Sequence, residues 1–328
     1  MVWYKDNNSD IIISTRIRLA RNLSNTPFPA MLKDKSKAIE QIKNSIISSC
    51  STLSKDFEFY DTDSMSEKDI ALLTEEHLIS PQIKKGKGQA LLLNKDKTMS
   101  IMLMEEDHIR LQIIEQGEKL DEAYEKASRV DDVIEESVEY AFDEEFGYLT
   151  ACPTNTGTGM RASLMLHLNA LTQTNNINTI ISQASALGIE VRGLYGEGTK
   201  AYGNMYQISN RVTMGLCEKD ILKKLKDIVS QIVDAEKKAR ALIMEKNSDY
   251  IKNKVMRSYG ILKYAHTIDS SEARELISDV ILGQNLGIIE KGNISPIEML
   301  IKIAPSVTDG NTPLERDINR AAYLKENV

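Results

Sequence analysis

Cysteine is scarce in this sequence, and its spacing excludes two kinds of stabilising site. The 328 residues contain three cysteines, Cys50, Cys152 and Cys217, which lie far apart along the chain. Because no C-x-x-C pair is present, neither a disulfide framework nor a cysteine zinc site is expected. The thiols are therefore expected to be reduced, as they are in the cytoplasm.

Targeting signals and long apolar runs are also lacking. The first ten residues, MVWYKDNNSD, contain no apolar core of a signal peptide. No run of about 18 apolar residues occurs, so no membrane span is expected. The phosphate-binding loop G-x-x-x-x-G-K-[ST] is absent as well. We therefore expect a cytoplasmic protein, in which any nucleotide site must be built from other residues.

The chain has no excess of positive charge. Lys and Arg together number 41 and Asp and Glu 48, which gives a formal net charge of −7. This balance argues against a broad nucleic-acid surface but leaves room for a local basic pocket. The apolar content of 41% and the charged content of 27% are ordinary for a soluble globular protein.

The order of the hydrophobic patterns predicts an α+β domain followed by a small helical one. Extended segments are expected at residues 11–22, 88–94, 99–104, 109–114, 189–195 and 203–212. Helices are expected at residues 34–48, 118–141, 161–171 and 217–246. Strand signals then stop, and short helical patterns follow, separated by Gly260, Gly283, Gly287, Gly292 and Pro305. The predicted domains are therefore residues 1–245 and residues 246–328.

Arginines recur at predicted strand edges or beside glycines. They form four sets: Arg16 with Arg18, Arg110, Arg161, and Arg192 with Arg211. In an extended segment Arg16 and Arg18 lie on the same face. Guanidinium groups bind phosphate oxygens in pairs and remain charged at any ordinary pH. Converging arginines could hold a triphosphate; alternatively, each one pairs with a surface carboxylate.

The stretch CPTNTGTGMRASLMLHL, residues 152–168, joins a glycine-rich loop to an arginine. Gly157 and Gly159 would let backbone N–H groups approach an anion, and the pattern after Arg161 predicts a helix. Together they suggest an anion held at a helix N-terminus. The alternative is an ordinary structural connector.

Carboxylates are also concentrated at two positions. E-E-D-H, residues 105–108, follows a predicted strand, and grouped carboxylates are costly unless a metal, an arginine or a substrate neutralises them. Glu197 lies between Gly196 and Gly198, which favours a mobile loop such as a lid. Either group could instead be a solvated acidic turn.

Four motifs occur in a fixed order over roughly residues 10–215. They are S-T-R-I-R (14–18), E-E-D-H-I-R (105–110), C-P-T-N-T-G-T-G-M-R-A-S (152–163) and R-G-L-Y-G-E-G-T (192–199). Together they resemble the ATP:guanido phosphotransferases, the phosphagen kinases. The resemblance implies an antiparallel-sheet catalytic domain flanked by helices. H-L-I-S-P-Q-I (77–83) and R-D-I-N-R-A (316–321) resemble motifs of the bacterial protein-arginine kinases in this family.

The resemblance implies an ATP site assembled from several segments. The implied ATP contacts are Ser14, Thr15, Arg16, Ile17, Arg18, His77, Arg110, Arg161, Ala162, Ser163, Leu164, Met165, Arg192, Gly193, Leu194, Tyr195 and Gly196. Mg²⁺ would arrive with the phosphates, and no metal site made of protein ligands is implied.

The resemblance also implies a guanidinium site. Glu106 would be the main catalytic carboxylate with Glu105 beside it, Glu197 would come from the mobile loop, and Cys152 would be the reactive cysteine. A buried structural thiol is the alternative for Cys152. Two carboxylates can hold a guanidinium, aim one nitrogen at the γ-phosphorus and accept its proton.

The chain departs from the family pattern beside both groups of carboxylates. The family usually has asparagine where this chain has Met104, and a carboxylate where it has Lys200. Neither change removes an implied catalytic group. Both could alter the loops around the guanidinium.

The position of the first arginine motif bears on the acceptor. Small-molecule phosphagen kinases carry a helical domain before this motif, which here begins at residue 14. The more open site that this implies would suit an arginine displayed on a protein. The resemblance thus implies an ATP-dependent protein-arginine kinase, with a kinase of a free guanidino compound or a weakly catalytic phosphoarginine-binding adaptor as alternatives.

The C-terminal motif implies regulation. Arg316 and Arg320 share one face of a predicted helix. By resemblance they would bind phosphoarginine, with Asp317 and Ala321, at an allosteric site; neutralisation by Glu315 and Asp317 is the alternative. The resemblance further implies a homodimer and the marking of proteins for Clp-type proteolysis. A Clp ATPase, a small zinc-binding activator protein and a heat-shock repressor would be partners.

Overall fold

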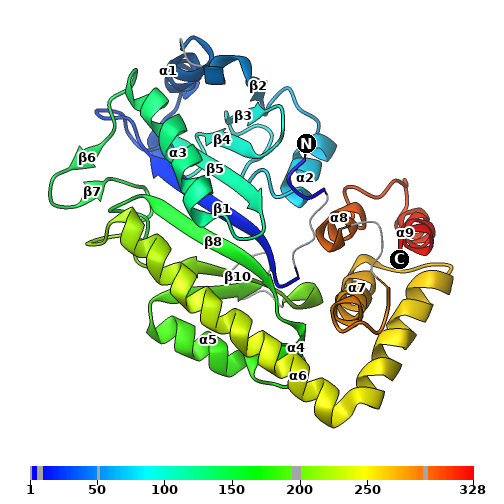
Figure 1. Ribbon diagram of the computed structural model, residues 1–328. Helices are drawn as coiled ribbons and strands as arrows, with labels where there is room; N and C mark the ends of the chain where they lie inside the picture. Colours follow the sequence, from blue (N-terminus) through cyan, green and yellow to red (C-terminus); the bar gives the residue numbers. More distant parts are fainter. Residues whose placement is uncertain (1, 6–9, 50–51, 194–200, 291–294) are drawn as a thin grey trace.

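An antiparallel sheet forms the centre of the protein. The computed structural model describes residues 2–5, 10–49, 52–193, 201–290 and 295–328. Eight strands follow one another in the order β2-β3-β4-β5-β1-β8-β10-β9, and each neighbouring pair is antiparallel. Their bounds are β1 Ile12–Arg21, β2 Phe57–Asp61, β3 Ala90–Asn94, β4 Met99–Leu103, β5 Ile109–Gln116, β8 Met160–His167, β9 Ile189–Gly193 and β10 Met205–Asn210. The first strand thus lies at the middle of the sheet (Figure 1).

Helices cover one face of this sheet (Figure 1). They are α1 (Ser36–Ile47), α3 (Leu120–Glu135), α5 (Ile177–Ala186) and the first half of α6 (Glu218–Tyr264). Alternation places Ile17 of β1, Leu111 of β5 and Leu164 of β8 toward these helices, and all three are buried. Burial of such side chains stabilises the fold by roughly 2 kcal/mol each.

The C-terminal helices pack around a second core. Helix α6 has a non-helical backbone conformation at Asn247 (φ −137°, ψ 33°), after which it leads to α7 (Ser270–Asn285), α8 (Pro296–Lys302) and α9 (Pro313–Asn327). This core joins the N-terminal Trp3, Ile114 of β5 and Ile277 of α7. Helix α2 (Glu67–Glu75) contributes to it through Ile70 and Leu73. The helical region therefore packs onto the sheet domain.

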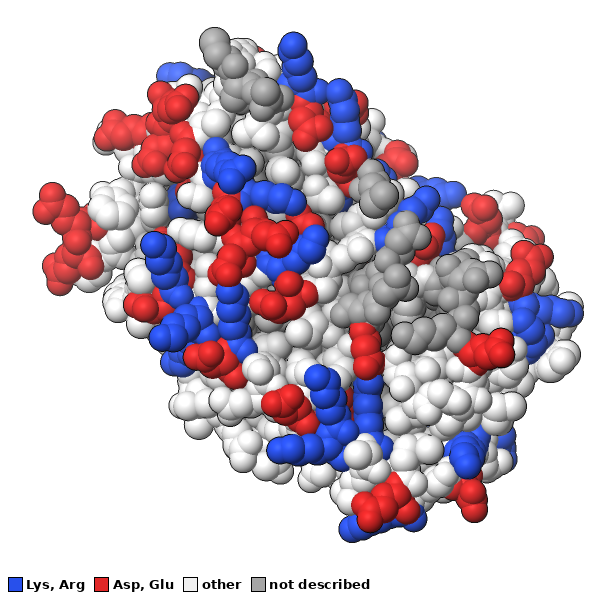
Figure 2. Space-filling model, in the orientation of Figure 1, with Lys and Arg blue, Asp and Glu red and all other residues white. Residues whose placement is uncertain are grey.

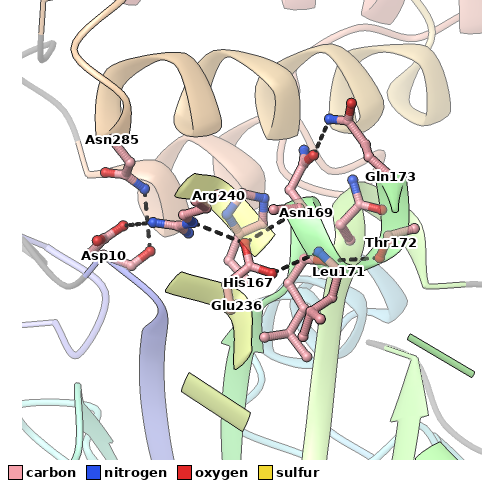
Figure 3. Close-up of polar contacts among 12 residues, drawn as sticks. Asp10, His167, Asn169, Leu171, Thr172, Gln173, Glu236, Arg240 and Asn285 are labelled. Carbon is pink, nitrogen blue, oxygen red and sulfur yellow. Dashed lines mark hydrogen bonds and ion pairs between the residues drawn. The ribbon is translucent and has the colours of Figure 1, made fainter. Parts of the chain in front are cut away.

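A buried polar network joins helix α6 to the start of α4 (Asn169–Gln173) and to Asp10, just before β1 (Figure 3). Glu236 of α6 is fully buried, and its carboxylate accepts hydrogen bonds from the backbone N–H groups of Ala170 (3.0 Å) and Leu171 (2.9 Å). It also accepts one from Nε of Arg240 (2.9 Å), whose Nη1 donates to Asp10. One carboxylate thus accepts hydrogen bonds from the first backbone N–H groups of α4 and from a buried guanidinium, so these polar groups are not left without partners.

The expected fold class is confirmed: helices and an antiparallel sheet are followed by a C-terminal helical region. The predicted helix at residues 161–171 is wrong, because strand β8 occupies Met160–His167. Its positions from Ala162 to His167 are all buried, and a strand buried on both faces reads as a continuous apolar run. Such a run cannot be told from a helix by periodicity alone.

Other boundaries also differ from the predicted ones. Helix α3 ends at Glu135, and α6 continues to Tyr264 rather than stopping near residue 246. Gly260 and Gly283 lie within α6 and α7, not between helices. A Cβ at Gly283 would lie 2.3 Å from Val255 Cγ1, so this glycine permits close contact between the two helices. Strand β2, helices α2 and α5, and the hairpin β6 (Phe142–Asp143) with β7 (Gly147–Tyr148) were not predicted.

Among the described residues, no helix combines the length and the apolar character needed to cross a bilayer.

Replacement of Glu236 by alanine should strongly destabilise the fold. The change leaves Arg240 buried without its partner on α6 and removes the acceptor for two backbone N–H groups, which should lower the free energy of unfolding by about 3–5 kcal/mol. Urea denaturation measures this loss. The exposed Lys238→Ala on the same helix should change it by less than about 0.5 kcal/mol. Equal, small effects of both changes would contradict a structural role for the network.

Candidate active site

The sheet face opposite the helices carries the predicted arginines. Arg18 of β1 lies directly across from Arg161 of β8, and Arg16 follows two positions along β1 on the same face. Arg110 of β5 pairs with Ala20, which shares this face. The register through Met165 and Gln207 also places Arg192 of β9 here. Five arginines from four strands therefore occupy one surface, called here the arginine face.

The guanidinium groups on this face lie close enough to repel one another. Burial, and then the charges of Arg161 and Arg110, lower the pKa of Arg16 to about 10. Burial and the neighbouring arginines, Arg16 first, lower the pKa of Arg18 well below its ordinary value. Within the described part of the chain, Nε of Arg18 is buried and has no hydrogen-bond partner. An anion on this face would relieve this repulsion.

One carboxylate partly balances the cluster at its β9 side. Glu190 forms ion pairs with Arg161 and, at 2.6 Å, with Nη2 of Arg192. Burial alone would raise its pKa, but the bonds to these two arginines hold the pKa below its usual value. Glu190 was not predicted as a site residue. Its position two residues before Arg192 in strand β9 is the signal that could have pointed to it.

His77 borders the same face. Its backbone carbonyl accepts a hydrogen bond from Nε2 of Gln112 (2.9 Å), and Gln112 lies opposite Arg18 across β1 and β5. Burial, followed by the charges of Arg16 and Arg274, lowers the pKa of His77 to about 3. The imidazole is therefore neutral beside the arginines at physiological pH.

Arg110 connects the arginine face to the acidic loop between β4 and β5. Its Nη1 lies 2.7 Å from Oε2 of Glu105, and its Nη2 lies 3.1 Å from Oε2 of Glu106. The Glu105 side chain is 1% exposed and that of Glu106 is 33% exposed, so this is not a solvated acidic turn. Burial raises the pKa of Glu106, although Arg110 opposes the shift. The accessible Glu106 carboxylate therefore accepts a proton more readily than an ordinary glutamate does.

The residue before this acidic pair has an unusual backbone conformation. Met104 is buried with φ 60°, in the left-handed region, and its N–H donates to the carbonyl of His108 (3.1 Å). A non-glycine residue there carries about 1 kcal/mol of strain, and asparagine tolerates the conformation better than most. This explains why asparagine suits the position and shows that Met104 keeps the tight turn nonetheless.

Asp107 ties the acidic loop to the loop that carries Cys152. Its Oδ1 accepts hydrogen bonds from the Ala151 N–H (2.7 Å) and from Nδ2 of Asn22 (2.7 Å). Cys152 is partly exposed, and its Sγ lies 3.0 Å from Oγ1 of Thr154, so it is not a fully buried structural thiol. Asp107 was not among the predicted site residues, although the E-E-D-H motif contains it.

Arg21 holds the other end of the Cys152 loop. Its Nη2 forms a 2.7 Å ion pair with Asp131 of α3, its Nη1 donates to the Thr158 carbonyl (3.0 Å), and its guanidinium lies 3.5 Å from the centre of the Tyr148 ring. A Cβ at Gly159 would lie 2.5 Å from Nη1 of Arg21. The predicted anion site at a helix start is wrong, because β8 begins here. The glycine allows close packing, as the connector alternative expected.

The remaining predicted ATP contacts fall into three groups. Ser14, Ser163 and Met165 share the arginine face. Thr15, Ile17, Ala162 and Leu164 belong to the opposite, helix-covered side, and Gly193 ends β9. Leu194, Tyr195 and Gly196 lie outside the described residues, as do Lys200 and the predicted catalytic Glu197. Arg211 is exposed after β10.

The predicted phosphoarginine residues lie on α9. Arg320 is 2% exposed; Nε donates to the Ile303 carbonyl (2.7 Å), and Nη1 lies 2.6 Å from Oδ1 of Asp317. Arg316 is partly exposed, and its Nη1 donates to the Gly310 carbonyl (3.3 Å). Ala321 is buried. In this conformation Asp317 balances the charge of Arg320.

The described residues do not include a cluster of three or more His, Cys, Asp and Glu side chains placed to hold a metal ion.

Replacement of Asp107 by alanine should loosen the Cys152 loop. The change removes the acceptor of the Ala151 N–H and should lower the free energy of unfolding by about 1–3 kcal/mol. Hydrogen exchange should show faster exchange at Ala151 and unchanged protection in strand β10. Glu118→Ala, an exposed carboxylate, is the matched control. Unchanged exchange at Ala151 would show that Asp107 does not anchor this loop.

Comparison with known proteins identifies the family to which this geometry belongs. The family model for the C-terminal catalytic domain of ATP:guanido phosphotransferases matches residues 37–239. The model for the protein-arginine kinase McsB C-terminal domain matches residues 248–328. Among solved structures, a lombricine kinase gives a TM-score of 0.63 at 25% identity, over 70% of this chain and 67% of that one. The duplicated taurocyamine kinase of Schistosoma mansoni shares the fold, with a TM-score of 0.61 at 24% identity, over 84% and 46%.

Curated relatives match nearly the whole chain. The protein-arginine kinase of Halothermothrix orenii is 44% identical over 97% of this chain and 93% of its own length. Those of Brevibacillus brevis and Clostridium acetobutylicum are 42% and 44% identical over 99% of this chain, and over 94% and 97% of their own. The chain therefore belongs to the ATP:guanido phosphotransferase family and, within it, to the protein-arginine kinases, enzymes that transfer phosphate to guanidino groups.

Proposed function

We propose that this enzyme transfers the γ-phosphate of ATP to arginine side chains of proteins. The observation that carries the proposal is the position of Arg110, which belongs to the arginine face and also contacts Glu105 and Glu106. A phosphate group bound on that face would therefore lie next to two carboxylates suited to a guanidinium. The names of the full-length relatives support a protein as acceptor.

The arginine face would hold the triphosphate. Arg16, Arg18, Arg110, Arg161 and Arg192 would contact phosphate oxygens, and the neutral His77 would lie beside the nucleotide. Ser14, Ser163 and Met165 would line the same surface. Mg²⁺ would be carried by the phosphate oxygens and would neutralise part of their charge. Preformed positive charge is what phosphoryl transfer requires, since alignment and charge neutralisation supply most of the catalysis.

The acidic loop would hold the acceptor. Phosphate oxygens would compete for Arg110 and free Glu105 and Glu106 to bind the substrate guanidinium. Glu106 would orient one guanidinium nitrogen toward the γ-phosphorus and accept its proton as the N–P bond forms and ADP leaves. Its raised pKa favours this role, because a base works best when its pKa is near the operating pH. Glu197 would contribute a further carboxylate, and Cys152 would border the guanidinium.

The wider role is part of the same proposal. Phosphoarginine on target proteins would mark them for a Clp-type protease in the cytoplasm, with a Clp ATPase, a zinc-binding activator and a heat-shock repressor as partners. Two domains would meet near residue 245, and the C-terminal domain would form a homodimer. It would bind phosphoarginine through Arg316, Asp317, Arg320 and Ala321. For this, Arg320 would exchange its bond to Asp317 for one to the phosphate.

Two alternative functions predict different results from those of a protein-arginine kinase. A kinase of a free guanidino compound would phosphorylate free arginine as readily as arginine in an unfolded protein. A phosphoarginine-binding adaptor would bind modified proteins without turning over ATP. Incubation with ATP and each acceptor, followed by mass spectrometry, separates the three. Transfer to the protein alone is the expected result.

Replacement of Glu106 by glutamine should stop phosphate transfer while ATP still binds. The amide keeps the shape of the side chain but cannot accept the proton, so turnover should fall by roughly 10²–10⁴-fold. Calorimetry should give an ATP affinity within a factor of about three of the unmodified enzyme. Glu118→Gln serves as the exposed control. Near-normal turnover in Glu106→Gln would exclude the assigned base.

A further inference from the structure

Large apolar side chains are exposed on both sides of the Cys152 loop. On the hairpin β6–β7, Phe142 is 59% exposed and Phe146 is 46% exposed. After β10, Met214 is 46% and Leu216 39% exposed. These four residues are called the loop-flanking patch. Single exposed apolar residues are ordinary, but a group of them rimmed by polar residues marks an interaction site.

Backbone contacts place both parts of the patch against the same loop. Tyr148 of the hairpin and Gly157 of the loop exchange backbone hydrogen bonds of 2.8 and 3.3 Å. On the other side, Thr158 N–H donates to the Thr213 carbonyl (3.2 Å), and a Cβ at Gly157 would lie 2.7 Å from Met214 Cα. The loop that carries Cys152 therefore lies between the two halves of the patch.

The hairpin presents its aromatic side chains on a fixed base. The Phe142 ring packs edge-on against Tyr148, with centroids 5.2 Å apart, and Tyr148 in turn covers the buried guanidinium of Arg21. Arg21 is anchored by Asp131. Ordered aromatic side chains lose little conformational entropy when they bind a partner, so this base favours recognition.

Negative charge surrounds the hairpin part of the patch. Asp143, Glu144 and Glu145 separate the two phenylalanines. The Asp143 carboxylate accepts hydrogen bonds from the backbone N–H groups of Glu145 (2.9 Å) and Phe146 (3.0 Å) and so shapes the turn. Glu144 and Glu145 point to solvent. The hairpin projects from the body at the left of Figure 1, where Figure 2 shows a group of acidic side chains beside uncharged atoms.

We propose that the loop-flanking patch binds the polypeptide segment that carries the acceptor arginine. The inference rests on the proposed function and names the class of segment. Apolar residues near the arginine would pack on Phe142, Phe146 and Met214, and Lys or Arg residues would face Glu144 and Glu145. Apolar residues next to basic ones are exposed mainly where a protein is unfolded. The patch would therefore direct the enzyme to unfolded segments.

Two short peptides test this selectivity. Each contains one arginine, flanked either by leucine and lysine or by glycine and serine. We expect the unmodified enzyme to show a kcat/KM at least about tenfold higher for the first peptide, the ratio that 1.4 kcal/mol of extra binding gives. The double variant Phe142→Ser, Phe146→Ser should lose this preference. Its kcat/KM for the glycine–serine peptide and its ATP affinity should stay unchanged. Leu242→Ser, an exposed apolar residue on α6, is the control and should keep the preference.

A second double variant tests the contribution of the acidic residues Glu144 and Glu145. Glu144→Lys with Glu145→Lys should raise the KM for the lysine-containing peptide and leave that for the glycine–serine peptide unchanged. Fluorescence anisotropy of labelled peptides measures the dissociation constants of both peptides and does not require phosphate transfer. If no peptide is phosphorylated, the proposed function fails. The binding measurement then still shows whether the loop-flanking patch binds the leucine–lysine peptide.

Three results would overturn the inference. In the first, the double phenylalanine variant keeps the unmodified preference for the leucine–lysine peptide. In the second, the variant lowers kcat/KM for both peptides by the same factor, which would indicate a role in shaping the Cys152 loop. In the third, the variant changes the oligomeric state in gel filtration while peptide preference is retained, which would assign the patch to a second copy of the chain.

Discussion

Repulsion among the guanidinium groups on one sheet face is the constraint from which the site follows. Arg16, Arg18, Arg110 and Arg161 are all partly withdrawn from water. Burial, followed by the charges of the other three arginines, lowers the pKa of Arg18. Few carboxylates balance these charges. Glu190 forms ion pairs with two arginines, Arg161 and Arg192, and both Glu105 and Glu106 contact Arg110. Burying like charges costs stability unless an anion joins them. A polyphosphate is the anion that such a surface accommodates.

The antiparallel sheet makes this arrangement possible. Register fixes which side chains lie opposite one another, and alternation separates the charged face from the apolar one. The helices can therefore cover Ile17 and Leu164 without approaching Arg16 or Arg18. Rigid strands also hold the charges where they are needed before any ligand arrives, which is how preorganised sites reduce the cost of binding.

Much of this could be predicted from sequence, and the failures have physical causes. Period-two spacing places Arg16 and Arg18 on one face, and the ordered motifs indicate the family. The sequence of strand β8 predicts a helix because both faces of the strand are buried, which removes the alternation that marks a strand. The pattern predicts too short an α6 because only the first half of this helix faces the sheet, so the apolar spacing changes near Asn247 while the helix continues. The spacing of Glu190 and Arg192 puts both on one face of strand β9, but only the folded sheet brings Arg161 to the same carboxylate.

Supporting residues were hardest to find in the sequence. Asp107 and Arg21 hold the Cys152 loop from two sides, yet neither is needed to explain any single motif. Their contacts reach residues more than 40 positions away, so only the folded chain brings them together. The exposed phenylalanines of the hairpin are a similar case. They resemble core residues in sequence and are identified as surface residues only by the fold.

The most direct measurement compares the stability of Arg18→Met with and without ATP and Mg²⁺. Loss of one buried, repelled charge should raise the free energy of unfolding of the nucleotide-free enzyme by about 1–2 kcal/mol, while ATP should stabilise the variant much less than it stabilises the unmodified enzyme. Arg129→Met, at an exposed position of α3, should leave both quantities unchanged. A variant that is less stable without nucleotide and still gains the full stabilisation from ATP would contradict the account.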